Sequence, residues 1–236
     1  MSHNEYGLRV GAFRVFDALQ AARVPLVVAL DAATAERCET LVNHCRDLGA
    51  EFVAHGTTGS RMITAALSEE QERGEIESTL ERLESALGQR PVGWIGVEHG
   101  ESVHTPRLLA ESGMRYVCDW VNDEQPFMIT TPAGDIVALP LALELDDTYA
   151  LDDRGVPVWR YRTMIEDASD RLVQDAADGA RVLVLGLHPW LIGQAFPDRG
   201  ARARTRARHS PSGCSSRHGT RARRVVVRTK SGGRAE

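Results

Sequence analysis

The sequence lacks a long apolar segment, a basic leader and paired cysteines. No run of about 18 apolar residues occurs, which excludes a membrane-spanning helix of ordinary length. The first residues, MSHNEYGLRVG, contain no basic region followed by an apolar one, so no signal peptide is predicted. The four cysteines contain no CxxC pair. We therefore expect a cytoplasmic globular protein with reduced thiols and no membrane partner.

Two of the cysteines, Cys38 and Cys45, share one face of an expected helix, with His44 beside them. This arrangement is compatible with a metal site. Cysteines on a buried helix face are more often small apolar core residues. We therefore assign both to the core.

Lysine is almost absent, and the basic residues are unevenly placed. Residues 198–236 hold 12 of the 28 basic residues and 2 of the 33 acidic ones, a net charge of +10, which leaves −15 for residues 1–197. Such an asymmetry is typical of a tail that binds nucleic acid or membrane. However, Lys230 is the single lysine of the chain, and a nucleic-acid arm usually mixes lysine with arginine.

A second explanation of this segment is a shifted reading frame in GC-rich DNA. Its residues are mostly Arg, Ala, Gly, Ser, Thr and Pro, and most of these have GC-rich codons. Permitted codons for residues 198–220, read one nucleotide later, can encode TGALERALARAIRRRGVRRATG, which has the period of an amphipathic helix. We predict a domain over residues 1–195 and an Arg-rich, disordered tail over 196–236, with a frameshift as its source.

Helices and strands alternate through the acidic part of the chain. The apolar run PLVVAL at residues 25–30 is typical of a buried parallel strand, and the preceding residues 7–24 have helical spacing. This alternation predicts a mainly parallel sheet, either open or closed into a barrel. Further helices are expected over 34–48, 68–87, 105–112 and 160–177, and further strands over 51–56, 91–97, 115–120, 135–141 and 181–190, with an irregular stretch over 121–134.

The helix that follows Ser68 carries the clearest signals. Ser68 and Gln71 have the spacing of a capping box, and Gly88 is a typical helix terminator. Its expected apolar face consists of Ile76, Leu80, Leu83 and Leu87.

Polar residues follow several of the expected strands. Since sites in parallel α/β sheets lie at the carboxyl ends of strands, we expect these residues to converge. His55 can ligate a metal or serve as a hydrogen-bonded turn residue. Asp119 can orient a base or cap a turn. His188 enters a Pro-Trp turn from an apolar strand, which suits either acid–base catalysis or a structural role.

Several segments together resemble the polysaccharide deacetylases with a NodB-homology domain. They are EYGLRVGAFRVFDAL, EFVAHGTTGSRM, the helix that ends in ALGQRPVGW, TPRLLAESGMRYVCDWVNDEQPF, LELDD and LHPWLIGQ, in this order between residues 4 and 195. The branch that is most similar contains allantoinase-like and peptidoglycan-deacetylase-like proteins. The resemblance implies a distorted (β/α) barrel and hydrolysis of a non-peptide C–N bond, in an N-acetyl sugar or a cyclic amide.

The resemblance also implies roles for individual residues. His188 corresponds to the general acid, Asp119 to the catalytic aspartate of an aspartate-tryptophan motif, and His55 to a ligand of a divalent metal such as zinc. Substrate contacts are expected from Arg90, Trp94, Glu98 and Trp120. The expected partner is a glycan or a small-molecule substrate; nucleic acid is not expected.

The sequence departs from the family pattern at two places. Gly59 stands where a second metal histidine is expected, and the family's first strand, with its aspartate pair, has no counterpart before EYG. Metal-independent chemistry is therefore an alternative, and a non-catalytic carbohydrate- or ureide-binding protein is the second hypothesis after the hydrolase. A missing strand would also leave an unpaired sheet edge, from which we expect poor solubility or a homo-oligomer.

Overall fold

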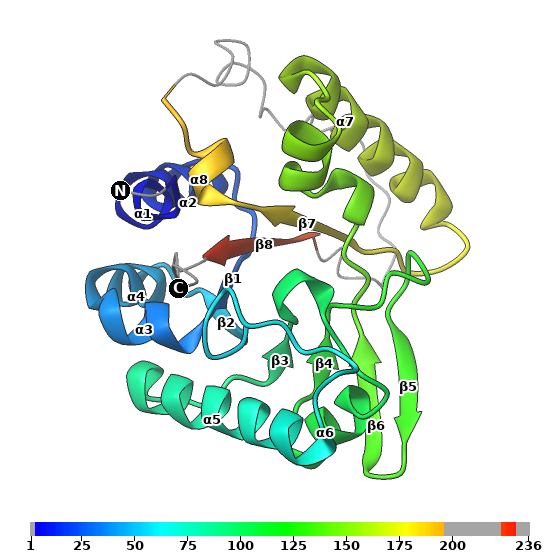
Figure 1. The fold of residues 1–236 in the computed structure, drawn as a ribbon. Helices are drawn as coiled ribbons and strands as arrows, with labels where there is room; N and C mark the ends of the chain where they lie inside the picture. The colour runs from blue at the N-terminus through cyan, green and yellow to red at the C-terminus, as the bar shows by residue number, and fades with distance from the viewer. Residues whose placement is uncertain (1–2, 196–222, 230–236) are drawn as a thin grey trace.

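The structure is a computed structural model that describes residues 3–195 and 223–229, and one eight-stranded sheet lies at its centre (Figure 1). The strand order is β5-β6-β4-β3-β2-β1-β8-β7. All neighbours pair in parallel except β5 and β6, which form an antiparallel hairpin. The strands are β1 Leu26–Leu30, β2 Glu51–Ala54, β3 Gly93–Trp94, β4 Tyr116–Val117, β5 Phe127–Thr131, β6 Gly134–Ala138, β7 Leu183–Leu187 and β8 Arg223–Thr229.

The parallel part of the sheet closes on itself. Beyond β6, Leu141 forms a parallel bridge with Val184 of β7, and the N–H of Ala142 donates to the carbonyl of Val184 at 3.0 Å. This contact joins the two ends of the parallel part, while β5 stays outside as an edge. The predicted distorted (β/α) barrel is thus confirmed.

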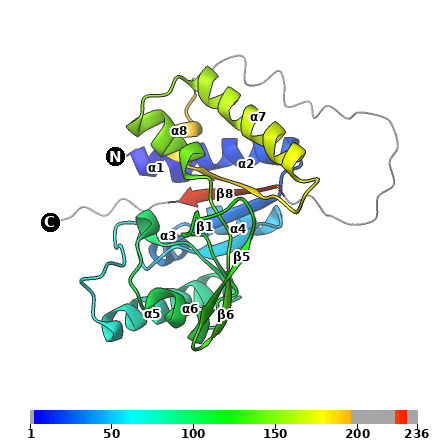
Figure 2. The ribbon, with the colours of Figure 1, turned by 90° about the vertical axis from the view of Figure 1, so that its right-hand side faces the viewer.

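Helices surround the outside of the sheet (Figures 1 and 2). In Figure 1, α5 lies along α3 and α6, and α1 and α2 lie beside α8. No helix in the described ranges is long and apolar enough to cross a bilayer. The helices are α1 His3–Tyr6, α2 Ala12–Ala21, α3 Ala32–Arg37, α4 Glu39–Asp47, α5 Glu69–Leu87, α6 Thr105–Glu111, α7 Val158–Asp175 and α8 Pro189–Ile192; π-helical turns span Gly7–Gly11 and Thr148–Asp153, and 3₁₀ turns span Val97–His99 and Leu143–Leu145.

Alternate residues of each strand enter two different cores. One core packs the outer face of the sheet against the helices, with Val28 and Trp94 among its members. The other fills the barrel interior, with Val27, Ile95 and Val184 among its members. This alternation follows from the two-residue period of a strand.

The predictions for α5 are confirmed in detail. The hydroxyl of Ser68 accepts from the N–H of Gln71 at 3.2 Å, and the Gln71 side chain accepts from the N–H of Ser68 at 2.9 Å. Gly88 ends the helix in the left-handed region, with a φ of 72°. All four predicted apolar residues of this helix are buried.

Two local predictions were wrong. The single helix expected over 34–48 is divided at Cys38, whose φ of −118° and ψ of 53° interrupt the helical backbone between α3 and α4. The stretch expected to be irregular contains β5, whose residues alternate between half-buried and exposed. An edge strand of this kind lacks the continuous apolar run that marks a buried parallel strand.

A segment of the predicted tail enters the sheet. Arg223–Thr229 forms β8, which pairs in parallel with both β1 and β7, so the expectations of disorder and of an unpaired edge do not hold here. Three consecutive valines within these residues provide the β-branched pattern that a strand favours. The remaining residues of the tail lie outside the described ranges, and the domain division and the frameshift stay predictions.

The first helical segments hold α8 by direct backbone contact. A Cβ on Gly193 would lie 2.5 Å from the Cα of Gly11, and a Cβ on Gly11 would lie 2.0 Å from the carbonyl oxygen of Pro189. The carbonyl of Gly193 also accepts from the Arg14 guanidinium at 3.1 Å and from the Tyr6 hydroxyl at 3.3 Å. Only glycine allows this approach.

The predicted core role of Cys45 is confirmed. Cys45 is buried in the outer core, and burial raises the pKa of its thiol to about 12. Cys38 is half-buried against the same core, and burial also raises the pKa of its thiol.

Candidate active site

A buried aspartate–histidine pair lies where β7 ends. His188 follows β7 directly, and Asp147 immediately precedes the π-helical turn Thr148–Asp153. The Nδ1 atom of His188 lies 2.6 Å from Oδ1 of Asp147, and the backbone N–H of His188 donates to Oδ2 at 2.8 Å. His188 is 2% exposed and Asp147 is 0% exposed. Both oxygens of one carboxylate therefore fix the position and orientation of the imidazole.

Burial has an electrostatic consequence for Asp147. Burial raises the pKa of this carboxyl, and the hydrogen bonds and charge of His188 oppose that shift. A carboxylate that is removed from water is stabilised by hydrogen bonds to its oxygens. The two hydrogen bonds from His188 therefore compensate part of the cost of burying Asp147.

Asp146, Asp147 and His188 each offer a metal-ligand atom within 4.8 Å of the others. As arranged, however, the Asp147–His188 contact has the length of a charge-assisted hydrogen bond. Oδ1 of Asp146 accepts from the N–H and hydroxyl of Thr148, at 3.0 and 2.5 Å. An ion with ligands at about 2.0–2.2 Å would have to replace the hydrogen bond between Asp147 and His188. As arranged, Asp147 and His188 form a hydrogen-bonded acid–base pair, and the same group offers three atoms that could hold an ion.

A second aspartate–histidine pair lies at the ends of β3 and β4. Asp119 follows β4, and its side chain is 2% exposed. Its carboxylate accepts the backbone N–H of Gly96 at 2.8 and 3.0 Å and lies 3.1 Å from Nδ1 of His99. The His99 side chain keeps 20% exposure. Asp119 thus orients an imidazole that reaches solvent.

The backbone around His99 is strained. Glu98 and His99 have φ values of 52° and 55°, in the left-handed region that side chains rarely adopt. The bonds from Asp119 to Gly96 and His99 hold this turn from both ends. Strain of this kind persists only where surrounding contacts determine the conformation, and it is concentrated at functional sites.

Glu101 adds a second carboxyl beside Asp119. Burial raises the pKa of Glu101 to about 9, with a smaller contribution from the negative charge of Asp119, and Trp120 opposes the shift. Glu101 is therefore neutral at neutral pH, and a neutral carboxyl can donate a hydrogen bond.

His55 lies at the end of β2 and is completely buried. Its Nδ1 atom lies 2.9 Å from the carbonyl oxygen of Ile95, which requires the proton on Nδ1. His55 is not a member of the Asp146–Asp147–His188 group, and its proposed metal role stays a prediction.

The remaining predicted residues lie in different environments. Trp120 is 36% exposed beside Asp119, and Glu98 is exposed on the strained turn. Trp94 is 1% exposed in the outer core. Arg90 precedes β3, at the opposite end of the strand from the site, and pairs with Glu84 at 3.0 Å. The structure thus brings Trp120 and Glu98 to the strand ends but not Trp94 or Arg90.

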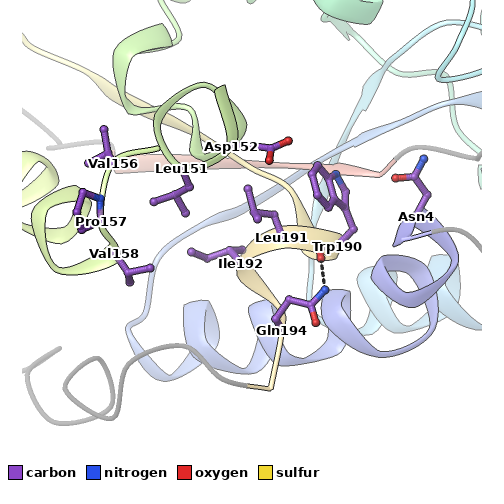
Figure 3. A pocket seen from close by; sticks show the side chains of 10 residues that line it. All are labelled: Asn4, Leu151, Asp152, Val156, Pro157, Val158, Trp190, Leu191, Ile192 and Gln194. Carbon is purple, nitrogen blue, oxygen red and sulfur yellow. Dashed lines mark hydrogen bonds between the residues drawn. The ribbon is translucent and has the colours of Figure 1, made fainter. Parts of the chain in front are cut away.

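A mainly apolar pocket of about 700 Å³ is lined by residues of the 151–158 segment and of α8 (Figure 3). It is formed by the segments that follow Asp147 and His188, including Leu151, Trp190 and Ile192, and by Asn4 of α1. A hydrogen bond of 2.7 Å from the Gln194 amide to the carbonyl of Trp190 stabilises its wall. The predicted site residues do not line this pocket.

Sequence reasoning missed Asp147 and Glu101. The two aspartates that end LELDD follow an apolar run, as the predicted residues His55, Asp119 and His188 do. This pattern could have identified Asp147. Glu101 had no such signal, because it lies in a loop and its environment depends on Asp119 from the next strand.

Comparison with known proteins relates part of the chain to one family. A family model described as polysaccharide deacetylase matches residues 5–117. Residues 5–117 are thus similar to the polysaccharide deacetylases. The predicted resemblance is therefore confirmed, and the deacetylase-family match includes β1 to β4 with His55 and His99.

Solved structures extend this similarity beyond the match. Puue allantoinase is 27% identical, with a TM-score of 0.73, over 81% of this chain and 63% of that protein. A protein from Pseudomonas aeruginosa PAO1 described as a probable polysaccharide deacetylase is 28% identical, also at 0.73, over 81% and 64%. A third protein, from Mycobacterium smegmatis and assigned to the polysaccharide deacetylases, is 28% identical at 0.73, over 85% and 70%.

The chain spans less than two thirds of the length of two of these proteins. A search of curated proteins found no match.

Proposed function

We propose that the protein is a hydrolase of non-peptide C–N bonds, acting on an N-acetyl sugar or a cyclic amide. The buried Asp147–His188 pair carries this proposal, because its geometry is that of an oriented acid–base catalyst. Similarity of residues 5–117 to the polysaccharide deacetylases and of the chain to an allantoinase supports the same reaction class.

In this proposal, His188 protonates the leaving nitrogen. Asp147 accepts a hydrogen bond from the Nδ1–H group of His188. The other ring nitrogen, Nε2, is then the atom that exchanges a proton with the substrate. Asp147 also stabilises the imidazolium that precedes this transfer, as a carboxylate beside a histidine does in other hydrolases. His99, oriented by Asp119, accepts a proton from the attacking water. One pair thus supplies the acid and the other the base.

The proposal assigns no step to a metal, since the Asp146–Asp147–His188 group fits a hydrogen-bonded pair. We expect purified protein to keep its turnover after treatment with a chelator and dialysis. Addition of zinc to the dialysed protein should then leave turnover unchanged. Loss on chelation with recovery on zinc addition would contradict this expectation and would favour a metal role for His55.

The main test measures hydrolysis of chitin oligosaccharides and of allantoin by the full chain and its variants. His188→Gln and Asp147→Asn should each lower kcat by a factor of about 10² to 10⁴, the usual contribution of acid–base catalysis. His104→Gln is the control, because His104 is half-buried and its side chain pairs with Glu69 at 3.7 Å and with neither aspartate of the two pairs. Equal turnover in wild type and His188→Gln would refute the assigned role.

A binding protein without turnover is the second candidate. It is favoured by Gly59, which stands where a second metal histidine is expected. Calorimetry with the same compounds separates the candidates. Binding with no product released would favour the second.

A further inference from the structure

The inner face of α5 buries two glutamates that the proposed reaction does not use. Glu72 is 0% exposed and Glu75 is 5% exposed, on the face that also carries Ile76 and Leu80. A buried carboxylate is unfavourable unless its oxygens are hydrogen-bonded. The hydrogen-bond partners of these two side chains therefore show which parts of the structure the two glutamates stabilise.

Glu75 holds the loop that follows β2. Its Oε1 atom accepts from the hydroxyl of Thr57 and from the N–H of Thr57 at 3.3 Å. Its other oxygen lies 3.0 Å from Nε of Arg61. Thr57 is two residues beyond His55, so Glu75 fixes the segment in which this histidine ends the strand.

Glu72 holds the loop that follows β3. Its two oxygens accept from the hydroxyl of Ser102 at 2.5 Å and from the hydroxyl of Thr105. Ser102 immediately follows Glu101, and Thr105 begins α6. Glu72 thus anchors the segment that follows the strained turn, whereas Asp119 holds the turn itself.

The two anchors lie about one helical turn apart on one rigid element. Residues three apart on a helix are neighbours on its surface, so Glu72 and Glu75 point to the same side. The capping box at Ser68 and the terminator Gly88 fix both ends of α5. The spacing of the two loops is therefore determined by the helix.

We propose that Glu72 and Glu75 are positioning residues of the active site. Glu75 positions the His55 loop, and Glu72 positions the loop that carries His99 and Glu101. This inference rests on the proposed function, because it assigns the two loops to one catalytic centre. Neither glutamate contacts the substrate.

The experiment compares Glu72→Gln and Glu75→Gln with Glu77→Gln, an exposed position of the same helix. Amide hydrogen exchange of the full chain is measured by mass spectrometry. Glu75→Gln should accelerate exchange in residues 55–61 alone, and Glu72→Gln in residues 97–105 alone. With the substrate of the proposed reaction, kcat of Glu72→Gln should fall about 10- to 100-fold while KM changes less than twofold, because His99 loses its orientation toward the attacking water. Glu77→Gln should change neither measurement.

Variants that keep each carboxylate partly satisfied provide a second test if a glutamine variant does not fold. Thr57→Val leaves the Arg61 contact of Glu75, and Thr105→Val leaves the Ser102 contact of Glu72. Each should loosen its own loop, and Thr→Ser at the same positions should restore slow exchange.

Equal acceleration in both loops, or none, would overturn the inference. So would loop-specific exchange in Glu72→Gln with unchanged kcat. If the wild-type chain hydrolyses no amide, the proposed function fails, and the exchange pattern alone decides whether the glutamates position the loops.

Discussion

At the residue scale, the environment of Glu101 makes stability depend on pH. Burial and the charge of Asp119 raise its folded-state pKa to about 9, above the ordinary value of 4.5. Glu72 and His99 are the other titratable groups near this carboxyl and its loop. A raised pKa means that the folded state binds the proton more tightly than the unfolded state.

We therefore predict that Glu101→Gln changes the pH dependence of unfolding. The contribution of Glu101 is fully present below pH 4.5 and is lost as pH rises from 4.5 to about 9. Relative to wild type, the variant should gain stability across this window. Urea unfolding at a series of pH values measures the difference, with Glu77→Gln as control. A constant difference at all pH values would contradict the prediction.

Local sequence identified only part of the first residue pair. His188 and Asp119 were found because they end apolar strands, a pattern visible within ten residues. Asp147 was not assigned, because its role depends on His188, 41 residues away. Trp94 shows the opposite error: its aromatic ring was placed in the site, but its position in β3 directs it to the outer core.

At the element scale, α5 was predicted most completely because its signals are local. A capping box, an apolar period and a terminal glycine lie within its own residues. The division between α3 and α4 could not be predicted in this way. The apolar residues keep their helical spacing across Cys38, and this spacing does not reveal one residue with a non-helical backbone. The buried Glu72 and Glu75 interrupt the apolar face of α5, and this was the sequence signal of their tertiary role.

The N-cap of α5 makes a measurable contribution to the free energy of unfolding. Ser68→Ala should lower the free energy of unfolding by about 1 kcal/mol, the usual effect of removing a helix N-cap. Ser78→Ala, within the same helix, is the control and should be neutral or slightly stabilising, since alanine favours helices. Thermal or urea unfolding measures both, and equal effects of the two changes would show that the cap contributes nothing.

At the scale of the whole molecule, β8 determines whether the barrel has open edges. It lies between β1 and β7 and pairs with both along their full lengths. The arginine-rich composition predicted disorder for this segment, although it contains three consecutive valines. A strand in the middle of a sheet is difficult to infer when its neighbours are distant in sequence.

Deletion of residues 223–229 from the full chain should therefore expose two strand edges. Unpaired edges promote pairing with other chains. We expect a lower Tm and concentration-dependent oligomers by light scattering, whereas deletion of residues 230–236 should change neither. A monomer with an unchanged Tm after the first deletion would show that β8 does not close the sheet in solution.

The contact between Gly11 and Gly193 also has a consequence for the order of events during synthesis. It joins positions near both ends of the first described range, and α8 directly follows His188. During translation, β1 to β4 leave the ribosome long before α8 does, and contacts of such separation form late. The nascent chain can therefore build most of its outer core while His188 is still absent. The Asp147–His188 pair and the contact of α8 with the π-helical turn Gly7–Gly11 therefore form after most of that core.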